Sequence, residues 1–334
     1  MANETGMLLI VTSSFDATVD FLLPLLPSGR VFRFNTDLFQ QYELLFDASG
    51  FTLTDPGGRS VTSGQIYKAY WRWPEWPAVK GREARYLQAE VRYLVREMTN
   101  LLWYESKFVL VEPGAPRRAG KLLQLIRARE FLNVPPFRAG LNLKFGPQDK
   151  LEVVKSLSKK FPDDKFIFST AVDPARLANN HPWFMQRYVQ ADFDVTVMVV
   201  GNRLFSFKLA RDFLETSIDW REIPGKEADW RPIELPETDR AAILRYMQAM
   251  HLDFGRLDFL MDAGGRLHFC EVNPNPQYLW LDPERAHGVV SAVIEEISPA
   301  TARHSIPIAH PLARAADACL GADRPDSGKE ALRA

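Results

Sequence analysis

Four polar residues near the end of the chain have the types and the spacing of a divalent-cation site. Arg256 and Asp258 lie in one run that largely alternates polar and apolar residues, and Glu271 and Asn273 lie in a second such run. A Gly-Gly pair at 264–265 separates the two runs, and both glycines tolerate positive φ. The stretch therefore predicts a β-hairpin with a two-residue turn.

The predicted turn also sets the register of this hairpin. Asp258 faces Glu271 across the two strands, and Arg256 faces Asn273. Side chains alternate between faces along a strand, so these four share one face. The other face carries Leu257, Phe259, His268, Cys270 and Val272. Opposed Cβ atoms are only ~4.5–5.5 Å apart, so the two carboxylates would repel each other unless a cation lies between them.

The chemistry of the donors indicates which cation this is. Asp258, Glu271 and Asn273 offer hard oxygen ligands, which favour magnesium or manganese over zinc. Magnesium held by few carboxylates shares its remaining coordination positions with water and nucleotide phosphates. Two simpler interpretations stay open. The charges could be solvated on an exposed hairpin, or one carboxylate could form a structural salt bridge with Arg256.

The order of these residues resembles the metal-binding hairpin of ATP-grasp carboxylate-amine ligases. The matching residues are Arg256-Leu-Asp258, a glycine turn, and Glu271-Val-Asn273-Pro274. The resemblance implies that Asp258, Glu271 and Asn273 bind Mg2+, with Mn2+ as a substitute. It also implies that Arg256 stabilises the phosphoryl and tetrahedral oxyanions.

Three further motifs are similar to the ATP-grasp enzymes that mature ribosomal peptides, the graspetide or microviridin-type synthetases. They are residues 31–37, residues 70–74 and Asp219-Trp-Arg221, and the last would lie near the active site. Two departures stand beside them. Residues 156–160 contain no glycine where many relatives carry a glycine-rich flap, and Thr196 replaces a basic residue.

The same resemblance implies an ATP site. Its residues are Lys121 and Lys155 for the phosphates, Gln186, Arg187, Tyr188 and Val189 of the linker strand for adenine, Asp194 for the ribose, and Lys208 and Arg211 for the γ-phosphate. A lysine serves a phosphate as a point charge. Taken without the resemblance, Lys121, Lys208 and Arg211 could equally be solvated surface charges.

Hydrophobic periodicity predicts the elements around this site. Apolar runs at 7–12 and 31–35 flank a helical segment at 16–25, which is a βαβ start. Residues 83–104 have the spacing of a long amphipathic helix, and residues 108–111 read as a strand that closes the first domain. The expected fold class is α/β and α+β, with an N-terminal pre-ATP-grasp α/β domain and two α+β subdomains that clasp the nucleotide. The expected boundaries are 1–116 for the N-terminal domain, 117–190 for the central subdomain, 191–298 for the C-terminal subdomain with the metal hairpin, and 299–334 for a disordered tail.

Composition limits the class of protein. A chain of 334 residues with 46% apolar and 25% charged residues is an ordinary soluble protein of two or three domains. A net charge of −1 does not indicate a protein that binds nucleic acid or membranes through its overall charge. Two cysteines cannot form a disulfide framework or a zinc cluster. The N-terminus lacks a secretory pattern and no run is long enough to span a membrane, so we expect a cytoplasmic location.

These observations together predict an enzyme. We expect an ATP-dependent ligase that activates a side-chain carboxylate as an acyl phosphate and forms ester or amide cross-links within a ribosomal precursor peptide. The alternative is a ligase for free amino acids or small peptides, of the glutathione-synthetase or glutamate-ligase type. A third hypothesis is a nucleotide-binding regulator without turnover. The expected partner is the precursor peptide, and the helix at 83–104 could support a homodimer.

Overall fold

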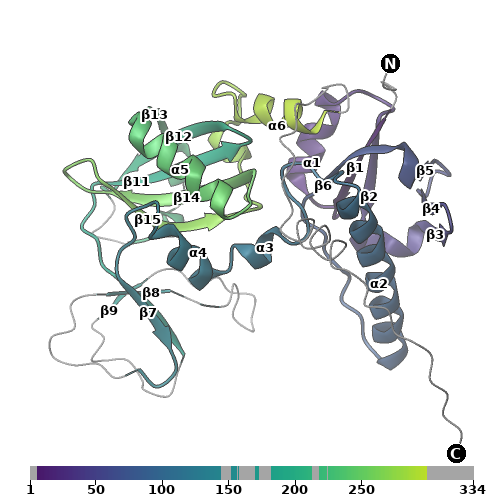
Figure 1. Cartoon of the computed structure of the whole chain (residues 1–334), viewed down its shortest axis with the longest axis horizontal. Coiled ribbons are helices and arrows are strands. Elements are labelled where there is room, and N and C mark those ends of the chain that lie inside the picture. Colours follow the sequence, from purple (N-terminus) through teal and green to yellow (C-terminus); the bar gives the residue numbers. More distant parts are fainter. Residues whose placement is uncertain are drawn as a thin grey trace, which may run out of the picture. The chain divides into compact units, whose positions relative to one another are not determined.

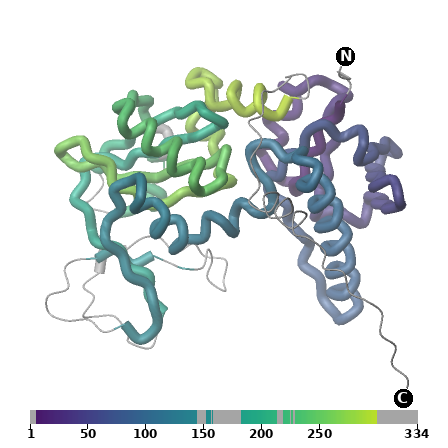
Figure 2. The backbone as a smooth tube through the Cα atoms, viewed as in Figure 1, coloured from purple at the N-terminus to yellow at the C-terminus, as the bar shows by residue number. Residues whose placement is uncertain are grey.

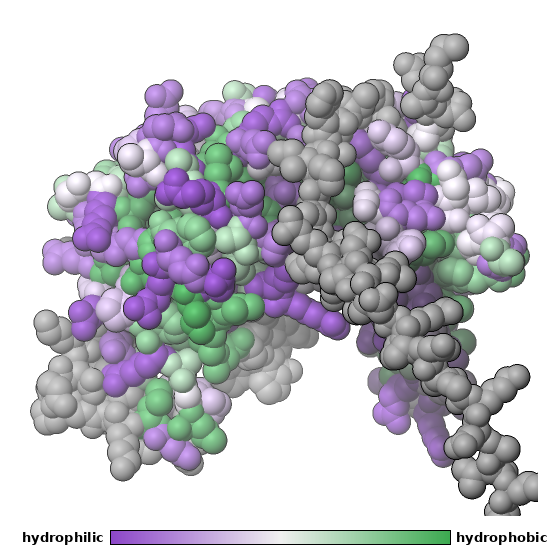
Figure 3. Space-filling view, in the orientation of Figure 1, coloured by the Kyte–Doolittle hydropathy of each residue, from purple (hydrophilic) through white to green (hydrophobic). Residues whose placement is uncertain are grey.

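The computed structural model of the chain describes residues 6–143, 152–155, 157, 170–172, 182–212, 218–223 and 225–298. Most of the predicted glycine-free flap at 156–160 and the whole of the tail from 299 onward lie outside the described residues. No helix in the described part is long and apolar enough to cross a membrane. On the face drawn in Figure 3, hydrophilic and hydrophobic residues are interspersed.

A parallel sheet begins the chain, with strand order β2-β1-β6. Its strands are β1 (Met7–Thr12), β2 (Val31–Asn35) and β6 (Ile66–Trp71). Helix α1 (Ala17–Leu22) connects β1 to β2, and the Asp16 side chain caps it by accepting hydrogen bonds from the backbone of Thr18 and Val19. The predicted βαβ start is therefore confirmed.

The second half of the long helix α2 (Arg82–Tyr104) packs against this sheet, and the rest of the helix extends beyond it (Figure 1). Its buried residues Val95, Met98 and Leu102 pack into a core with Leu9 and Val11 of β1. A small antiparallel sheet completes the same core, formed by β3 (Glu43–Asp47), β4 (Gly50–Thr54) and β5 (Ser60–Thr62). The amphipathic pattern thus predicted α2 almost to the residue.

The predicted strand at 108–111 is wrong. Only Phe108 pairs, as an isolated bridge to Ala69. Leu110 has φ 62°, a left-handed conformation that interrupts an extended strand. The chain then passes through the short helix α3 (Ala115–Arg118) to α4 (Lys121–Ala128).

A second, antiparallel sheet has the order β7-β10-β8-β9. Its strands are β7 (Phe137–Gly140), β8 (Glu152–Lys155), β9 (Thr170–Val172) and β10 (Trp183–Arg187). The predicted linker strand at 183–189 is β10, which ends two residues earlier. It lies between β7 and β8, so both of its backbone edges are paired.

The sheet that carries the polar hairpin has the order β13-β12-β11-β14-β15. Its strands are β11 (Phe193–Val200), β12 (Arg203–Ala210), β13 (Arg231–Ile233), β14 (Phe254–Met261) and β15 (Leu267–Asn273). Helix α5 (Glu237–Ala249) contributes Ile243, Tyr246 and Met247 to the core beneath this sheet. Helix α4 packs against β15, so the edge strand of the hairpin is supported.

The last helix returns to the N-terminal sheet. Figure 2 follows the chain from the purple N-terminal strands through the green C-terminal sheet to α6 (Val289–Ile297) in yellow. The buried Lys68 of β6 donates hydrogen bonds from Nζ to the backbone oxygens of Glu296 at 2.9 Å and Ser298 at 2.6 Å. A lysine there satisfies carbonyls that a helix end leaves without intrahelical partners.

The hairpin turn differs from the prediction. The backbone N–H of Asp262 bonds to the oxygen of Arg266, so the loop holds three residues, and only Gly265 is left-handed, with φ 78°. The Asp262 side chain accepts hydrogen bonds from the backbone N–H groups of Gly264 and Arg266, each at 3.0 Å. This aspartate-centred turn replaces the expected Gly-Gly turn.

A β-bulge at Cys270 then corrects the register. Phe259 pairs with Phe269, whereas Asp258 pairs with Glu271, so Cys270 is the extra residue. The predicted pairings Asp258–Glu271 and Arg256–Asn273 are confirmed because the longer turn and the bulge compensate each other. Beyond the bulge the prediction is wrong, since Phe269 and not Cys270 is the buried residue on the apolar face.

Alanine substitution at the two glycines should distinguish the observed turn from the predicted one. Gly265→Ala should lower the free energy of unfolding by about 1 kcal/mol, because a left-handed residue with a Cβ is strained. Gly264→Ala should lower the free energy of unfolding by less, since Gly264 does not have positive φ. Urea unfolding of both variants measures this difference. Equal losses would favour a two-residue turn with both glycines left-handed.

Candidate functional site

Asp258 is held by a basic and a hydroxyl side chain on the polar face of the hairpin. Arg256 donates from Nη2 to Asp258 Oδ2 at 3.0 Å and from Nε to Oδ1 at 3.2 Å. Thr196 lies opposite Asp258 on β11 and donates from Oγ1 to Oδ1 at 2.8 Å. The salt bridge that the sequence left open as an alternative is therefore present.

Glu271 differs from Asp258 in its side-chain contacts. It faces Asp258 across the hairpin and is half-buried. Among the residues that the structure describes, none forms a hydrogen bond or an ion pair with its carboxylate. A salt bridge to Arg256 accounts for Asp258 only, and the charge of Glu271 still requires a cationic neighbour.

Asn273 ends the second strand of the hairpin. Its side-chain Oδ1 accepts a hydrogen bond from the backbone N–H of Asn275 at 3.1 Å. An amide oxygen has two lone pairs, so this bond fixes the side chain and still leaves one acceptor position. The three predicted metal ligands therefore lie at one end of the hairpin, on paired positions.

The motif Asp219-Trp-Arg221 lies close to these carboxylates. The short 3-10 helix that contains Arg221 (Trp220–Glu222) is capped by Asp219. Arg221 donates to Asp219 from Nε at 2.8 Å and from Nη2 at 2.6 Å. These bonds raise the pKa of Arg221 most strongly, burial opposes them, and the charges of Glu271 and Asp258 raise the pKa further. Arg221 is thus a second fixed cation beside the hairpin, which the sequence indicated only through the motif.

Lys155 and Gln186 meet on adjacent strands of the second sheet. Lys155 Nζ donates to Gln186 Oε1 at 2.8 Å. Gln186 is buried, and its Nε2 has no hydrogen-bond partner among the described residues. A buried amide donor without an acceptor is costly, so this position fits a ligand that offers an acceptor atom.

The other linker residues lie at the end of the same strand. Arg187 is exposed, and its backbone N–H is already bonded to the oxygen of Pro136 at 2.8 Å. Tyr188 and Val189 follow and are half-buried. No described contact assigns these three residues a role toward a base, so their role in binding adenine stays a prediction.

Asp194 and Arg211 form a buried ion pair. Arg211 Nη1 lies 2.9 Å from both carboxylate oxygens of Asp194, and Nη2 donates to the backbone oxygen of Ile218 at 3.1 Å. Burial raises the pKa of Asp194 to about 7, Arg211 opposes this, and the charges of Asp219 and Asp258 add to it. The sequence assigned the two residues to ribose and to γ-phosphate, but the structure pairs them with each other.

The pKa of the Cys270 thiol is shifted by burial and by charges from both sheets. Burial raises the pKa of Cys270 to about 11, and Asp194, Asp258 and Glu271 raise it further. The charge of Lys155 acts in the opposite direction. The bulge therefore places Cys270 among the acidic residues and within electrostatic reach of the lysine from the second sheet.

Two predicted lysines are less closely tied to the hairpin. Lys208, on β12, lies over the ring of Phe193 with Nζ 4.5 Å from the ring centroid. Lys121 begins α4 and is half-buried. In that helix Gln124, whose role the sequence does not indicate, accepts a hydrogen bond from the backbone N–H of Val272 through its side-chain oxygen. Gln124 thereby closes the open edge of β15 next to Glu271.

Comparisons with known proteins give the fold. No protein-family model matches the chain, and no curated protein matches it. Among solved structures, the macrocyclase MdnC from Microcystis aeruginosa MRC, bound with precursor peptide MdnA, has a TM-score of 0.71 at 23% identity and covers 86% of this chain and 98% of its own. A RiPP-associated ATP-grasp ligase from Chryseobacterium gregarium, in complex with ADP and a leader and core peptide, has a TM-score of 0.72 at 19% identity and covers 89% and 98%.

A more distant structure shares the same architecture. D-alanine–D-alanine ligase from Bacillus anthracis, complexed with ATP, has a TM-score of 0.52 at 13% identity and covers 87% of this chain and 96% of its own. At these low identities, the structural similarity shows the fold alone. The predicted ATP-grasp fold, with its mixed α/β and α+β elements, is therefore confirmed.

The Asp194 pair predicts a pH dependence of stability. Its folded-state pKa of about 7 lies above the ordinary value of 3.8, so the folded protein holds this proton more tightly than the unfolded chain. Its contribution to stability is present at low pH and is lost as the pH rises from about 4 to about 7. Relative to Asp194→Asn, the thermal unfolding midpoint of the wild type should fall across that range. A constant difference would mean that Arg211 keeps the carboxylate ionised throughout.

Proposed function

We propose that the protein is an ATP-dependent ligase that forms ester or amide cross-links within a ribosomally made precursor peptide. The observation that carries the proposal is the pair Asp258 and Glu271, opposed on one hairpin and flanked by Arg256 and Arg221, in an ATP-grasp fold. The solved neighbours bound to a precursor, leader or core peptide favour a peptide substrate.

The donor set fits magnesium. Asp258, Glu271 and Asn273 are oxygen donors at one end of the hairpin, and the Glu271 carboxylate forms no ion pair or hydrogen bond among the described residues. These three residues would hold Mg2+, and Mn2+ accepts the same donors. When bound, the metal would neutralise phosphate charge and bring the nucleotide to the hairpin.

The second sheet fits a nucleotide. The unpaired Nε2 of Gln186 could donate to an acceptor on the adenine ring, beside the predicted backbone contacts of Arg187, Tyr188 and Val189. Lys155 and Lys121 would supply positive charge to the phosphates, with Lys208 at the γ-phosphate. Asp194 would accept from the ribose hydroxyls. Arg211 is already bonded to Asp194, so it would act on the γ-phosphate only if its guanidinium served the phosphate and Asp194 together.

The reaction has two steps in this proposal. A side-chain carboxylate oxygen of the peptide attacks the γ-phosphorus of ATP, and ADP leaves, giving an acyl phosphate. A hydroxyl or amine of the same peptide then attacks the acyl carbon, loses its proton, and inorganic phosphate leaves. The peptide loses one water overall. Arg256 and Arg221 are placed to stabilise negative charge that develops on the phosphoryl and acyl oxygens.

One observation favours a second candidate. Arg256 belongs to the hairpin itself, two residues before Asp258, and the resemblance associates this arrangement with ligases for free amino acids or small peptides. D-alanine–D-alanine ligase shares the fold. The same site chemistry would then join two separate molecules, so the product would gain mass.

The remaining assignments belong to the same proposal. We assign the domains 1–116, 117–190 and 191–298 to the pre-ATP-grasp, central and C-terminal parts, and expect a cytoplasmic enzyme that binds neither nucleic acid nor membrane. A homodimer would use the outer face of α2, where several large side chains are exposed. They are Tyr86, Leu87, Tyr93, Leu94, Trp103 and Tyr104.

Removing either opposed carboxylate tests the function. Asp258→Asn and Glu271→Gln should each lower ATP-dependent cross-linking of the precursor by at least about 100-fold, because the metal loses a charged ligand. Mass spectrometry of the peptide measures the water lost. Glu284→Gln removes an exposed carboxylate beyond the hairpin and should have no effect. Full activity in the Asp258 or Glu271 variant would refute the metal assignment.

Thr196 should act as a positioning residue for Asp258. Thr196→Val removes the hydroxyl that donates to Asp258 Oδ1 and should raise the Mg2+ concentration for half-maximal activity roughly tenfold. Thr196→Ser keeps the hydroxyl and should restore the wild-type value. If the valine and serine variants share one Mg2+ dependence, the hydroxyl does not orient the carboxylate.

A further inference from the structure

The carboxyl edge of the N-terminal sheet is a second place where this fold can bind a ligand. Strand β1 lies between β2 and β6, and all three run parallel. The chain leaves β1 toward β2 on one side, whereas β6 lies on the other side. Ligands of open parallel sheets bind outside the carboxyl ends of the strands at such a switch point. Here residues 13–16 follow β1, and Arg72 and Trp73 follow β6.

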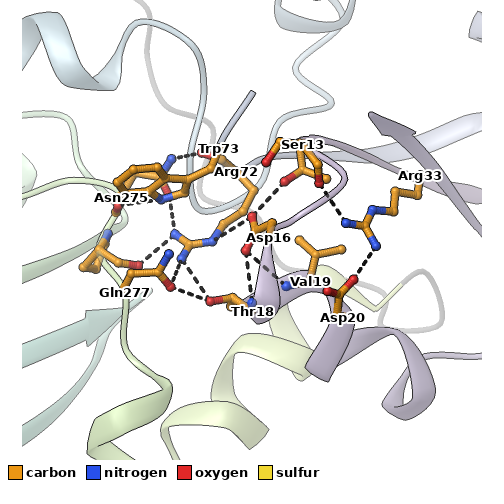
Figure 4. Close-up of polar contacts among 12 residues, drawn as sticks. Ser13, Asp16, Thr18, Val19, Asp20, Arg33, Arg72, Trp73, Asn275 and Gln277 are labelled. Carbon is orange, nitrogen blue, oxygen red and sulfur yellow. Dashed lines mark hydrogen bonds and ion pairs between the residues drawn. The ribbon is translucent and has the colours of Figure 1, made fainter. Parts of the chain in front are cut away.

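Arg72 joins this edge to the segment that leaves the polar hairpin (Figure 4). The side chain is fully buried and donates from Nη1 to Asn275 Oδ1 at 2.6 Å and to the Pro276 oxygen at 2.7 Å. Its Nη2 donates to Gln277 Oε1 at 3.0 Å, and its Nε lies 3.7 Å from Asp16 Oδ2. The sheet edge and the hairpin exit are therefore one rigid polar cluster.

Trp73 is fixed by the same cluster and yet remains open to solvent. Its Nε1 donates to the Asn275 backbone oxygen at 3.2 Å, and the Arg72 guanidinium lies 5.9 Å from its ring centroid. The side chain is still 37% exposed. A tryptophan held in one orientation with part of its ring exposed can bind a partner at little cost in conformational entropy.

Phe15 is exposed on the neighbouring loop. The residues on both sides of it are anchored, since Ser14 bonds to Asp37 through its backbone and its hydroxyl, and Asp16 caps α1 beside Arg72. Phe15 itself is 62% exposed. The backbone of this loop is therefore positioned, whereas the aromatic side chain at its tip meets solvent.

A third aromatic residue continues the path toward the carboxylates. Trp280 donates from Nε1 to the Gln277 backbone oxygen at 3.2 Å. The guanidinium of Arg256 lies 5.6 Å from the Trp280 ring centroid, and Arg256 pairs with Asp258. Contacts thus run without a break from Trp73 through the segment 275–277 to Trp280 and Arg256.

We propose that Phe15 and Trp73, here called the aromatic shelf, bind the segment of the precursor peptide that carries the reacting carboxylate. The inference rests on the proposed function, which places the carboxylate at Arg256. A peptide lying on the shelf passes from the sheet edge to that arginine, with its apolar side chains on the rings. Aromatic faces supply much of the binding energy in such contacts and tolerate varied sequences.

Binding without turnover tests the shelf directly. The probe is a fluorescent synthetic peptide encoded by a short reading frame beside the gene, titrated with protein in the presence of Mg2+ and ADP. Phe15→Ala and Trp73→Ala should each weaken peptide binding roughly tenfold. Trp73→Phe, which keeps a ring but loses the bond to Asn275, should weaken it less than the alanine variant.

Matched controls lie elsewhere in the N-terminal part of the chain. Leu45→Ala and Tyr67→Ala remove large side chains that are 62% and 47% exposed and have no described link to the hairpin. Both should bind the peptide like the wild type. Thermal unfolding and ADP titration check that each variant is folded, and Phe15→Ala keeps the test decisive if Trp73→Ala is unstable.

The outcomes separate this inference from the proposed function. Unchanged binding in both shelf variants overturns the shelf, as does a wild type that does not bind the peptide or control variants that weaken binding equally. If the peptide binds through the shelf but loses no water when ATP replaces ADP, the ligase proposal is refuted. The shelf is then still a peptide-binding surface.

Discussion

The opposition of Asp258 and Glu271 across two paired strands is the constraint on which the site depends. Backbone hydrogen bonding fixes the register, so the two residues stay opposed on neighbouring strands as long as the sheet is intact. Arg256 pairs with Asp258, and Thr196 donates a hydrogen bond to it. Arg221 lies where the charges of both carboxylates raise its pKa. No described side chain pairs directly with the Glu271 carboxylate, so a structural salt bridge alone does not account for the site, and the geometry indicates a metal and a phosphate.

The carboxyl end of the second strand is fixed from outside the hairpin by two contacts. Gln124 of α4 accepts from the Val272 N–H at the open edge of the sheet, and Arg72 holds the segment that follows Asn273. These contacts join residues more than a hundred positions apart in the sequence. The metal ligands are therefore positioned by the helix that begins with Lys121 and by the N-terminal sheet at once, which is the preorganisation that phosphoryl transfer requires.

The sequence predicted the strongly periodic elements and the pairing that matters, but not how the pairing is achieved. A Gly-Gly pair predicts a two-residue turn. Asp262, however, binds the two nearby N–H groups and selects a three-residue loop, and the bulge at Cys270 restores the register. Both effects depend on one side chain and one extra residue, which leave little trace in hydrophobic periodicity. The Arg72 cluster and the pairing of Asp194 with Arg211 could not be predicted because they require tertiary contacts.

The central claim is tested most directly by the intact mass of the candidate precursor peptide after incubation with the protein, ATP and Mg2+. The account predicts the loss of one water for each cross-link, no change when ADP replaces ATP, and no change with Glu271→Gln. A gain of an amino-acid residue in the presence of free amino acids would contradict cross-linking within the peptide and favour the second candidate. An unchanged mass under all conditions would contradict both.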